Sequence, residues 1–137
     1  MRVKIVGEQY DIKGNKLDEI VLVSEAEVQH KDGVYIIDYE ESINNPDSGK
    51  KTRVRAYENK LSMTKFGTVS SVMEFEAGKA AESLYATEYG SIKMNVETVE
   101  YKYDFNENCT GEIHLRYKIS MGDDSPFENV LNIKTFI

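Results

Sequence analysis

The stretch "IHLRYKISM", residues 113–121, alternates apolar and polar side chains at every position. In a β-strand successive side chains point to opposite sides of the sheet, so this alternation puts all the apolar residues on one face. His114 and Arg116 would then lie on the other face, toward solvent. The period of two predicts a half-buried antiparallel strand rather than a helix.

The same period recurs along the whole chain, and no segment has convincing helical spacing. We predict strands, some of them parts of one long bent strand, in the following segments. They are residues 2–12, 19–31, 34–42, 51–58, 60–66, 70–77, 80–87, 89–97, 99–106, 112–121 and 127–137. Short turn sequences such as Asp32-Gly33 and Asn59-Lys60 separate them. Strands joined by such short loops are neighbours in the sheet, which predicts an antiparallel meander.

Matching apolar with apolar residues, and charges with opposite charges, predicts the register of the sheet. The predicted pairs are Ser42–Lys51, Glu40–Arg53, Asp38–Arg55, Tyr39–Val54, Ile37–Ala56, Ala56–Met63, Glu58–Leu61, Met63–Met73, Leu61–Phe75, Phe105–Ile113, Tyr103–Leu115, Tyr101–Tyr117, Met121–Phe127 and Tyr117–Leu131. The pair Met63–Met73 requires a three-residue loop from Gly67 to Val69. Around Gly7 and around Glu97-Thr98 the apolar residues switch from one set of alternate positions to the other. We expect bulges or corners there.

About ten antiparallel strands in one small domain would expose long edges if the sheet stayed flat and open. Closure removes those edges, so we expect an all-β fold, with residues 1–137 forming a single closed barrel of about 8–10 strands. A two-sheet sandwich is the alternative. A barrel of about eight strands is either filled by its own side chains or holds one small ligand.

Composition excludes several classes of partner. The net charge of −7 would repel nucleic acid over most of the surface, so we expect no nucleic-acid partner. No stretch approaches the roughly 20 apolar residues of a membrane span, and the N-terminus lacks the pattern of a signal peptide. Cys109 is the sole cysteine, which agrees with a reducing compartment. We expect a soluble, cytoplasmic protein with neither a membrane partner nor a cofactor.

Several segments resemble a known family: "YIIDYEES" at 35–42, "TKFG" at 64–67, "MEFEAGKAAESLYATEYGSIKM" at 73–94 and "NVLNIK" at 129–134. Together they resemble the YwiB-like family of bacterial proteins, over essentially the whole chain. The resemblance implies a lipocalin-like (calycin-type) β-barrel and implies no activity or cofactor. The chain departs from the family pattern at Glu88, where proline is common, and at Lys65, where arginine is common.

The most specific of these segments is Tyr-x-Thr-x-Tyr-Gly, which places Tyr85, Thr87 and Tyr89 on one strand face. Three hydroxyls on an apolar wall would orient a small amphipathic ligand. Alternatively, they are amphipathic barrel residues whose hydroxyls bond to backbone or water. The complete predicted ligand-binding set is Tyr39, Glu41, Tyr85, Thr87, Tyr89 and Tyr117.

Two other groups of residues suggest chemistry. His30 is expected at a barrel rim near Glu41, and a histidine with a carboxylate can transfer protons. No nucleophile or third partner accompanies them in the sequence, so we expect no catalytic residues. Lys51, Arg53 and Arg55 form a basic stripe that would hold an anion, although cross-strand pairing with acidic residues of segment 34–42 also explains it.

The leading functional hypothesis is a non-enzymatic barrel that binds a small, partly apolar molecule in its mouth or lumen. The alternative is a protein–protein interaction or structural module with a filled barrel, acting through an outer strand face or as a homodimer. Val21, Val23 and Phe136, which fall on outward-facing positions, would mark that contact surface. A hydrolase or isomerase is the third hypothesis.

Overall fold

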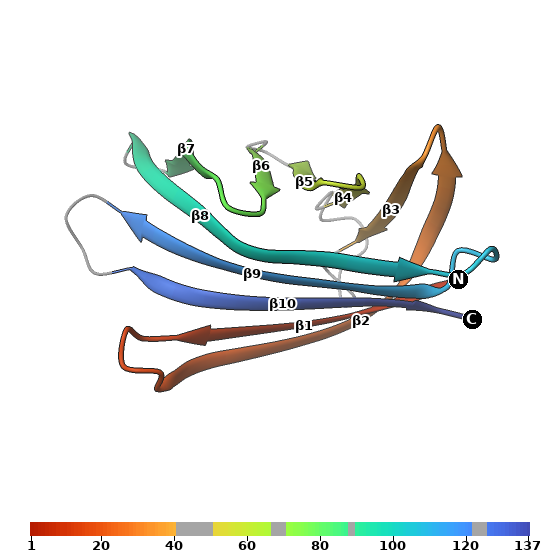
Figure 1. Ribbon diagram of the computed structural model, residues 1–137, viewed down its shortest axis with the longest axis horizontal. Helices are drawn as coiled ribbons and strands as arrows, with labels where there is room; N and C mark the ends of the chain where they lie inside the picture. Colours follow the sequence, from red (N-terminus) through yellow and green to blue (C-terminus); the bar gives the residue numbers. More distant parts are fainter. Residues whose placement is uncertain (41–50, 67–70, 88–89, 122–125) are drawn as a thin grey trace.

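The computed structural model describes residues 1–40, 51–66, 71–87, 90–121 and 126–137, and this part of the chain folds as strands without a helix. Figure 1 shows their arrangement. The strands are β1 (Arg2–Tyr10), β2 (Lys16–Lys31), β3 (Val34–Glu40), β4 (Lys51–Ala56), β5 (Lys60–Phe66), β6 (Ser71–Glu76), β7 (Ala80–Thr87), β8 (Gly90–Phe105), β9 (Gly111–Met121) and β10 (Phe127–Phe136). The predicted all-β fold is confirmed.

All ten strands belong to one antiparallel sheet, in the order β6-β5-β4-β3-β2-β1-β10-β9-β8-β7. Chain neighbours are sheet neighbours at nearly every step, as the meander predicts. The first and last strands also pair with each other, from Arg2 opposite Phe136 to Tyr10 opposite Glu128. This pairing curls the sheet round on itself, so that its two edges, β6 and β7, approach each other. The result is a nearly closed barrel.

Two long strands turn the corners of this barrel. β2 pairs with β1 as far as Glu25 and with β3 from Ala26 onward. β8 pairs with β7 along its first half and with β9 from Met94, with an irregularity between Thr98 and Glu100. Predicted segments 89–97 and 99–106 are therefore one bent strand, and the bulge expected near Glu97-Thr98 is confirmed.

The bulge expected around Gly7 is misplaced. Gly7 lies in a regular ladder, opposite Ile20 of β2 and Leu131 of β10. The irregularity occurs later, between Gln9 and Tyr10. Because glycine has no side chain, Gly7 interrupts the apolar pattern of β1 without interrupting its backbone pairing.

The inward-facing side chains pack into one core. Its largest fully buried members come from both halves of the barrel and are Val3, Ile37, Val54, Leu61, Phe75, Ile113, Leu115 and Ile133. Met63 opposite Met73 and Leu61 opposite Phe75 are paired as predicted. Burial of each such side chain contributes about 1.5–3 kcal/mol, so this core is the main source of stability. The predicted loop from Gly67 to Val69 lies outside the described residues.

Four predicted registers, those of β3–β4, β4–β5, β8–β9 and β9–β10, are wrong by two residues, although each puts side chains on the correct face. For example, Arg53 lies opposite Asp38 rather than Glu40. The observed partners include Glu40–Lys51, Tyr39–Thr52, Ile37–Val54, Ile36–Arg55, Ala56–Leu61, Phe105–Gly111, Tyr103–Ile113, Tyr101–Leu115, Thr98–Tyr117, Ile119–Phe127 and Leu115–Leu131.

Turn geometry explains two of these shifts. The amide of Tyr57 donates to the carbonyl of Lys60 at 2.8 Å, so the β4–β5 loop is Glu58-Asn59 rather than Asn59-Lys60. The amide of Asn106 donates to the carbonyl of Thr110 at 2.8 Å, which starts the β8–β9 ladder already at Phe105. A shift of two residues preserves every face, so the hydrophobic pattern does not detect it.

Aromatic residues tie the two halves of the barrel together near the β2–β3 turn. Tyr35 stacks on Phe105 with ring centroids 4.1 Å apart, and His30 stacks on Tyr35 at 4.1 Å. The Tyr101 hydroxyl of β8 donates to the carbonyl of Tyr57 at 2.6 Å. β8 is thereby fixed to the β4–β5 turn, across the barrel.

The closeness of β8 and β9 at Gly111 yields a first prediction. A Cβ at Gly111 would lie 2.2 Å from the Asp104 carbonyl oxygen and 2.7 Å from Phe105 Cα, so the backbone would have to move. Gly111→Ala should lower the free energy of unfolding by about 2–4 kcal/mol in urea titrations. Gly7→Ala is the matched control, because its Cβ would meet Leu131 Cδ1 at 3.9 Å. Equal losses in both variants would contradict this account.

Buried tyrosines should make the fold sensitive to alkali. Burial raises the pKa of Tyr101 and, separately, that of Tyr117 above the ordinary value. Unfolded tyrosine ionises near pH 10, so stability is fully present below about pH 10 and is lost as pH rises toward the raised pKa values. The melting temperature should fall as the pH rises from about 8 to 11.5, and it should fall less steeply in Tyr101→Phe. An equally steep fall in the variant would show that Tyr101 does not cause the effect.

Candidate functional site: a wedge between β2 and β3

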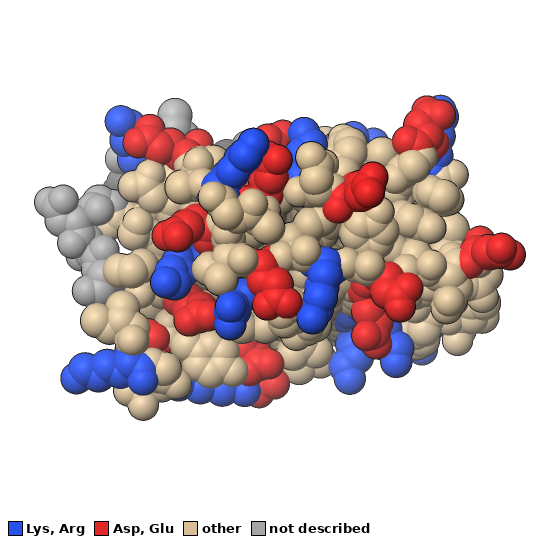
Figure 2. All heavy atoms as spheres, in the orientation of Figure 1, with Lys and Arg blue, Asp and Glu red and all other residues tan. Residues whose placement is uncertain are grey.

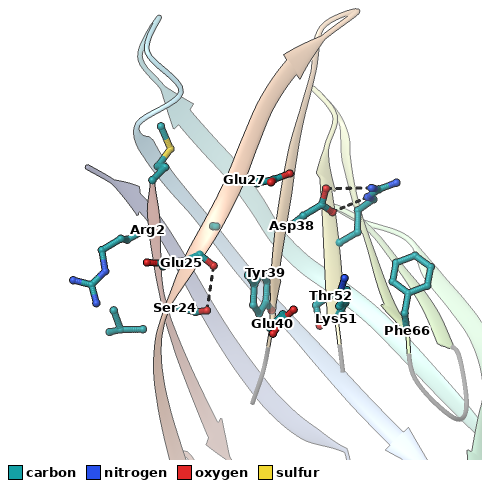
Figure 3. A pocket seen from close by; sticks show the side chains of 14 residues that line it. Arg2, Ser24, Glu25, Glu27, Asp38, Tyr39, Glu40, Lys51, Thr52 and Phe66 are labelled. Atoms are coloured by element: carbon teal, nitrogen blue, oxygen red, sulfur yellow. Dashed lines mark hydrogen bonds and ion pairs between the residues drawn. The ribbon is translucent and has the colours of Figure 1, made fainter. Parts of the chain in front are cut away.

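A groove opens where β2 changes partner. From Ala26 onward β2 is paired with β3, whereas up to Glu25 it is paired with β1. Below this point β2 and β3 diverge (Figure 3). The resulting wedge encloses about 950 Å³. We call it the β2–β3 wedge. It is a product of the barrel corner rather than of any local sequence motif.

Residues from the inward face form the floor of the wedge. Tyr39, Thr52 and Ala26 line it and are themselves buried in the protein. Tyr39 lies opposite Ala26 on one side and opposite Thr52 on the other, so the three form a continuous row across β2, β3 and β4. Met1, Val23 and Phe66 add apolar surface, and Phe66 is 43% exposed. These walls present apolar surface, whereas the floor residues Tyr39 and Thr52 are almost wholly covered.

Charged groups of both signs border the wedge. Arg53 binds Asp38 through two contacts, Nε to Oδ1 at 2.7 Å and Nη2 to Oδ2 at 3.1 Å. The hydrogen bond to this carboxylate raises the pKa of Arg53. Glu40 lies opposite Lys51, two positions further along the ladder on the same face. Two residues of the basic stripe are therefore matched by acidic residues of β3, with partners shifted by two positions from the prediction, whereas Arg55 lies opposite Ile36.

The formal charges of the wedge nearly cancel. Its described lining contains three cations, Arg2, Lys51 and Arg53. Four carboxylates accompany them, from Glu25, Glu27, Asp38 and Glu40, which leaves a formal charge of −1. Such a mixed surface is unsuited to selecting an anion by charge alone. It suits a molecule whose polar groups are neutral or of both signs.

The geometry can be compared with known proteins. The sequence model of a family described as a domain of unknown function, DUF1934, matches residues 3–133. The chain belongs to the DUF1934 family. No curated protein matches its sequence. The described residues include no helix with the length and apolar character needed to cross a membrane.

A solved structure adds evidence on the fold of this DUF1934 protein. The crystal structure of the YwiB protein from Bacillus subtilis matches it with a TM-score of 0.76 and 19% sequence identity. The match covers 99% of this chain and 91% of the YwiB chain. At this identity the likeness concerns the fold, and the resemblance to the YwiB-like family is confirmed.

Of the predicted ligand-binding residues, the structure places Tyr39 in the wedge. Tyr117 faces inward from β9, but it contacts Phe75 at a ring distance of 4.6 Å and is not among the described wedge residues. Tyr85 and Thr87 lie in β7, opposite Ile92 and Gly90, in a backbone position remote in the sheet order from β3. Their side chains are not described, and Glu41 and Tyr89 lie outside the described residues.

Sequence reasoning missed Arg2, Glu25 and Phe66 as members of one site. They come from β1, β2 and β5, and nothing in their local sequence marks them. A usable signal was the length of segment 19–31, which is longer than one pairing partner requires and so indicates a corner. Thr52 of β4 also lines the wedge, and it is likewise absent from the predicted ligand-binding set.

Two other groups of polar residues lie away from the wedge. His30 is exposed at the rim, as predicted, but its ring is engaged in the stack on Tyr35. The outer face of β8–β10 carries interspersed charges of both signs (Figure 2). There Glu100 contacts Lys102 at 3.2 Å and Arg116 at 4.0 Å, and the bond to Lys102 is the main cause of its lowered pKa. Among the described residues, no three His, Cys, Asp or Glu side chains cluster as metal ligands.

The Asp38–Arg53 pair should contribute modestly to stability, because both side chains are partly exposed. A double-mutant cycle with Asp38→Ala and Arg53→Ala should give a coupling energy of about 0.5–1 kcal/mol that shrinks with added salt. The more exposed Glu100–Lys102 pair is the control and should couple less. Coupling that does not respond to salt would mean that the wedge is more shielded from water than its geometry indicates.

Proposed function

We propose that this protein is a non-enzymatic, lipocalin-like barrel of the cytoplasm that binds a small, partly apolar molecule in the β2–β3 wedge. The observation that carries the proposal is the wedge itself, at about 950 Å³. Ligand sites typically measure about 300–1,000 Å³ and combine apolar walls with a few fixed polar groups. The presence of a single cysteine, Cys109, agrees with the reducing conditions of the cytoplasm.

The packed core favours the wedge over the lumen as the place of binding. Inward residues from nearly every strand belong to one contiguous buried cluster. Opening a ligand-sized cavity there would cost the contacts of several large side chains. The wedge needs no such rearrangement, because the divergence of β2 from β3 already forms it.

The polar groups of the wedge support recognition rather than catalysis. Asp38 and Arg53 are held together by a bidentate ion pair, which fixes the positions of both side chains. A general acid or base must reach a proton on the substrate, and both carboxylate oxygens of Asp38 are already bonded to Arg53. These groups are placed to orient a ligand that carries hydrogen-bonding groups at one end and apolar surface at the other.

Native mass spectrometry of protein purified from cells tests this proposal. We expect a population whose mass exceeds that of the chain by one small molecule. As a defined probe, Nile red, an uncharged dye of fused aromatic rings with a carbonyl group, should bind saturably with a fluorescence increase. Phe66→Ala removes an exposed wall of the wedge, and should weaken probe binding roughly tenfold, or about 1.4 kcal/mol, with little change in stability.

Val72→Ala is the matched control. Val72 is also a large exposed hydrophobic residue, 53% exposed, but it lies on β6 and is not among the described wedge residues. Equal loss of probe binding in both variants would place the probe on general apolar surface. Absence of both the mass excess and saturable binding would refute the proposal.

A further inference from the structure

The N-terminal half of β2 has one unpaired edge among the described residues. Residues 16–25 pair with β1 on one side, whereas β3 pairs only with Ala26–Lys31 on the other. Figure 1 shows the β1–β2 hairpin reaching well beyond the point where β2 meets β3. No described strand continues the sheet along this edge.

The direction of each backbone amide and carbonyl in β2 determines which residues can form hydrogen bonds at the unpaired edge. The amide of Ala26 donates to the carbonyl of Met1 at 2.9 Å, so Ala26 directs its amide toward β1. Hydrogen-bonding direction alternates along an antiparallel strand, so Leu22 and Ile20 also face β1. Glu19, Val21 and Val23 therefore direct their amides and carbonyls toward the unpaired edge.

The side chains of this segment are also unusually apolar for an edge. Ile20 is 63% exposed and Val21, on the opposite face, is 57% exposed. The run from Ile20 to Ser24, "IVLVS", contains no charge or proline. Proteins normally protect edge strands with charges, prolines or bulges, because a bare apolar edge recruits another strand. The centre of this edge has none of these, which indicates that a strand covers it in the working protein.

We infer that the covering strand is β2 of a second copy, paired antiparallel about a two-fold axis at Val21. In this register Val21 faces the partner's Val21, Ile20 faces the partner's Leu22 and Glu19 faces the partner's Val23. Apolar side chains meet on both faces of the sheet, and no two carboxylates are opposed. Three hydrogen-bonded pairs, supplying about six backbone hydrogen bonds, join the copies.

The backbone phase excludes the neighbouring registers. The axis must pass through a residue whose amide faces the edge, which leaves Glu19, Val21 and Val23. An axis at Glu19 would oppose two like carboxylates, which is destabilising. An axis at Val23 would run partner residues 16–20 along residues 26–30, where β3 is already paired, whereas the Val21 axis brings only the partner's Lys16 to this stretch, opposite Ala26. The Val21 axis gives a closed dimer rather than an open chain of copies, because both copies use the same surface.

Sedimentation velocity of the full-length protein tests the dimer. The wild-type chain should sediment as a dimer that dissociates on dilution, whereas Val21→Lys should be monomeric, because two lysines would meet on the axis. The exposed position of Val21 lets the variant fold, which the circular dichroism spectrum checks. Val72→Lys makes the same chemical change on β6 and should remain dimeric. Val21 does not line the wedge, but Val23, Ser24 and Glu25 on the same edge do, so the dimer and the ligand share a border. Probe binding is therefore measured separately on Val21→Lys, which should be monomeric and should still bind the probe.

Hydrogen exchange gives a second measurement that needs no variant. The amides of Val21 and Val23 should be protected at high protein concentration and exchange faster on dilution, whereas the amide of Leu22, bonded within the β1 ladder, should not respond. A wild-type monomer at all concentrations, or a dimer that survives Val21→Lys, would overturn the inference. Protection of Val21 in a monomer would also overturn it, since another segment of the same chain would then cover the edge.

Discussion

The pairing of the first strand with the last is the constraint on which the structure depends. A meander by itself has two free ends, and the β1–β10 ladder places them side by side in the middle of the sheet. The sheet must then curl, because β6 and β7 become its edges and approach each other. One set of alternate side chains is thereby enclosed, and burial of this set supplies most of the stability. Weakening that ladder would release both halves of the core.

Corner strands leave accessible surface on the otherwise closed sheet. A long strand that pairs with one neighbour along its first part and with another along its second part has an unpaired side where the change occurs. In β2 the change of partner at Glu25 and Ala26 produces the wedge and, within the part of the chain that the structure describes, the unpaired edge beside it. β8 makes a similar change, but its C-terminal half is held by Tyr101 and by the stack of Tyr35 on Phe105. The two corners therefore differ in how much backbone and side chain they leave available.

The filled interior separates this protein from a barrel that encloses its ligand. Tyr39 illustrates the difference, since it belongs to the buried core and also lines the wedge. A residue in that position couples the packing of the barrel to anything that occupies the groove. The balanced charges around it, with Asp38 bound to Arg53, would favour shape and hydrogen bonding over net charge in the choice of ligand.

The sequence by itself determined the strand content, the meander order and the face of nearly every described side chain. Alternation is a local property, so Leu115 and Met63 could be assigned to the core without knowing their neighbours. Register was different, because a slip of two residues leaves each face unchanged, and only turns such as Glu58-Asn59 select the pairs. Of the predicted ligand-binding residues the wedge contains Tyr39, but the rest of its lining could not be assembled from the sequence. It joins Arg2, Glu25 and Phe66 from three strands, and their meeting is decided by where β2 exchanges β1 for β3, a consequence of barrel closure that no short segment encodes.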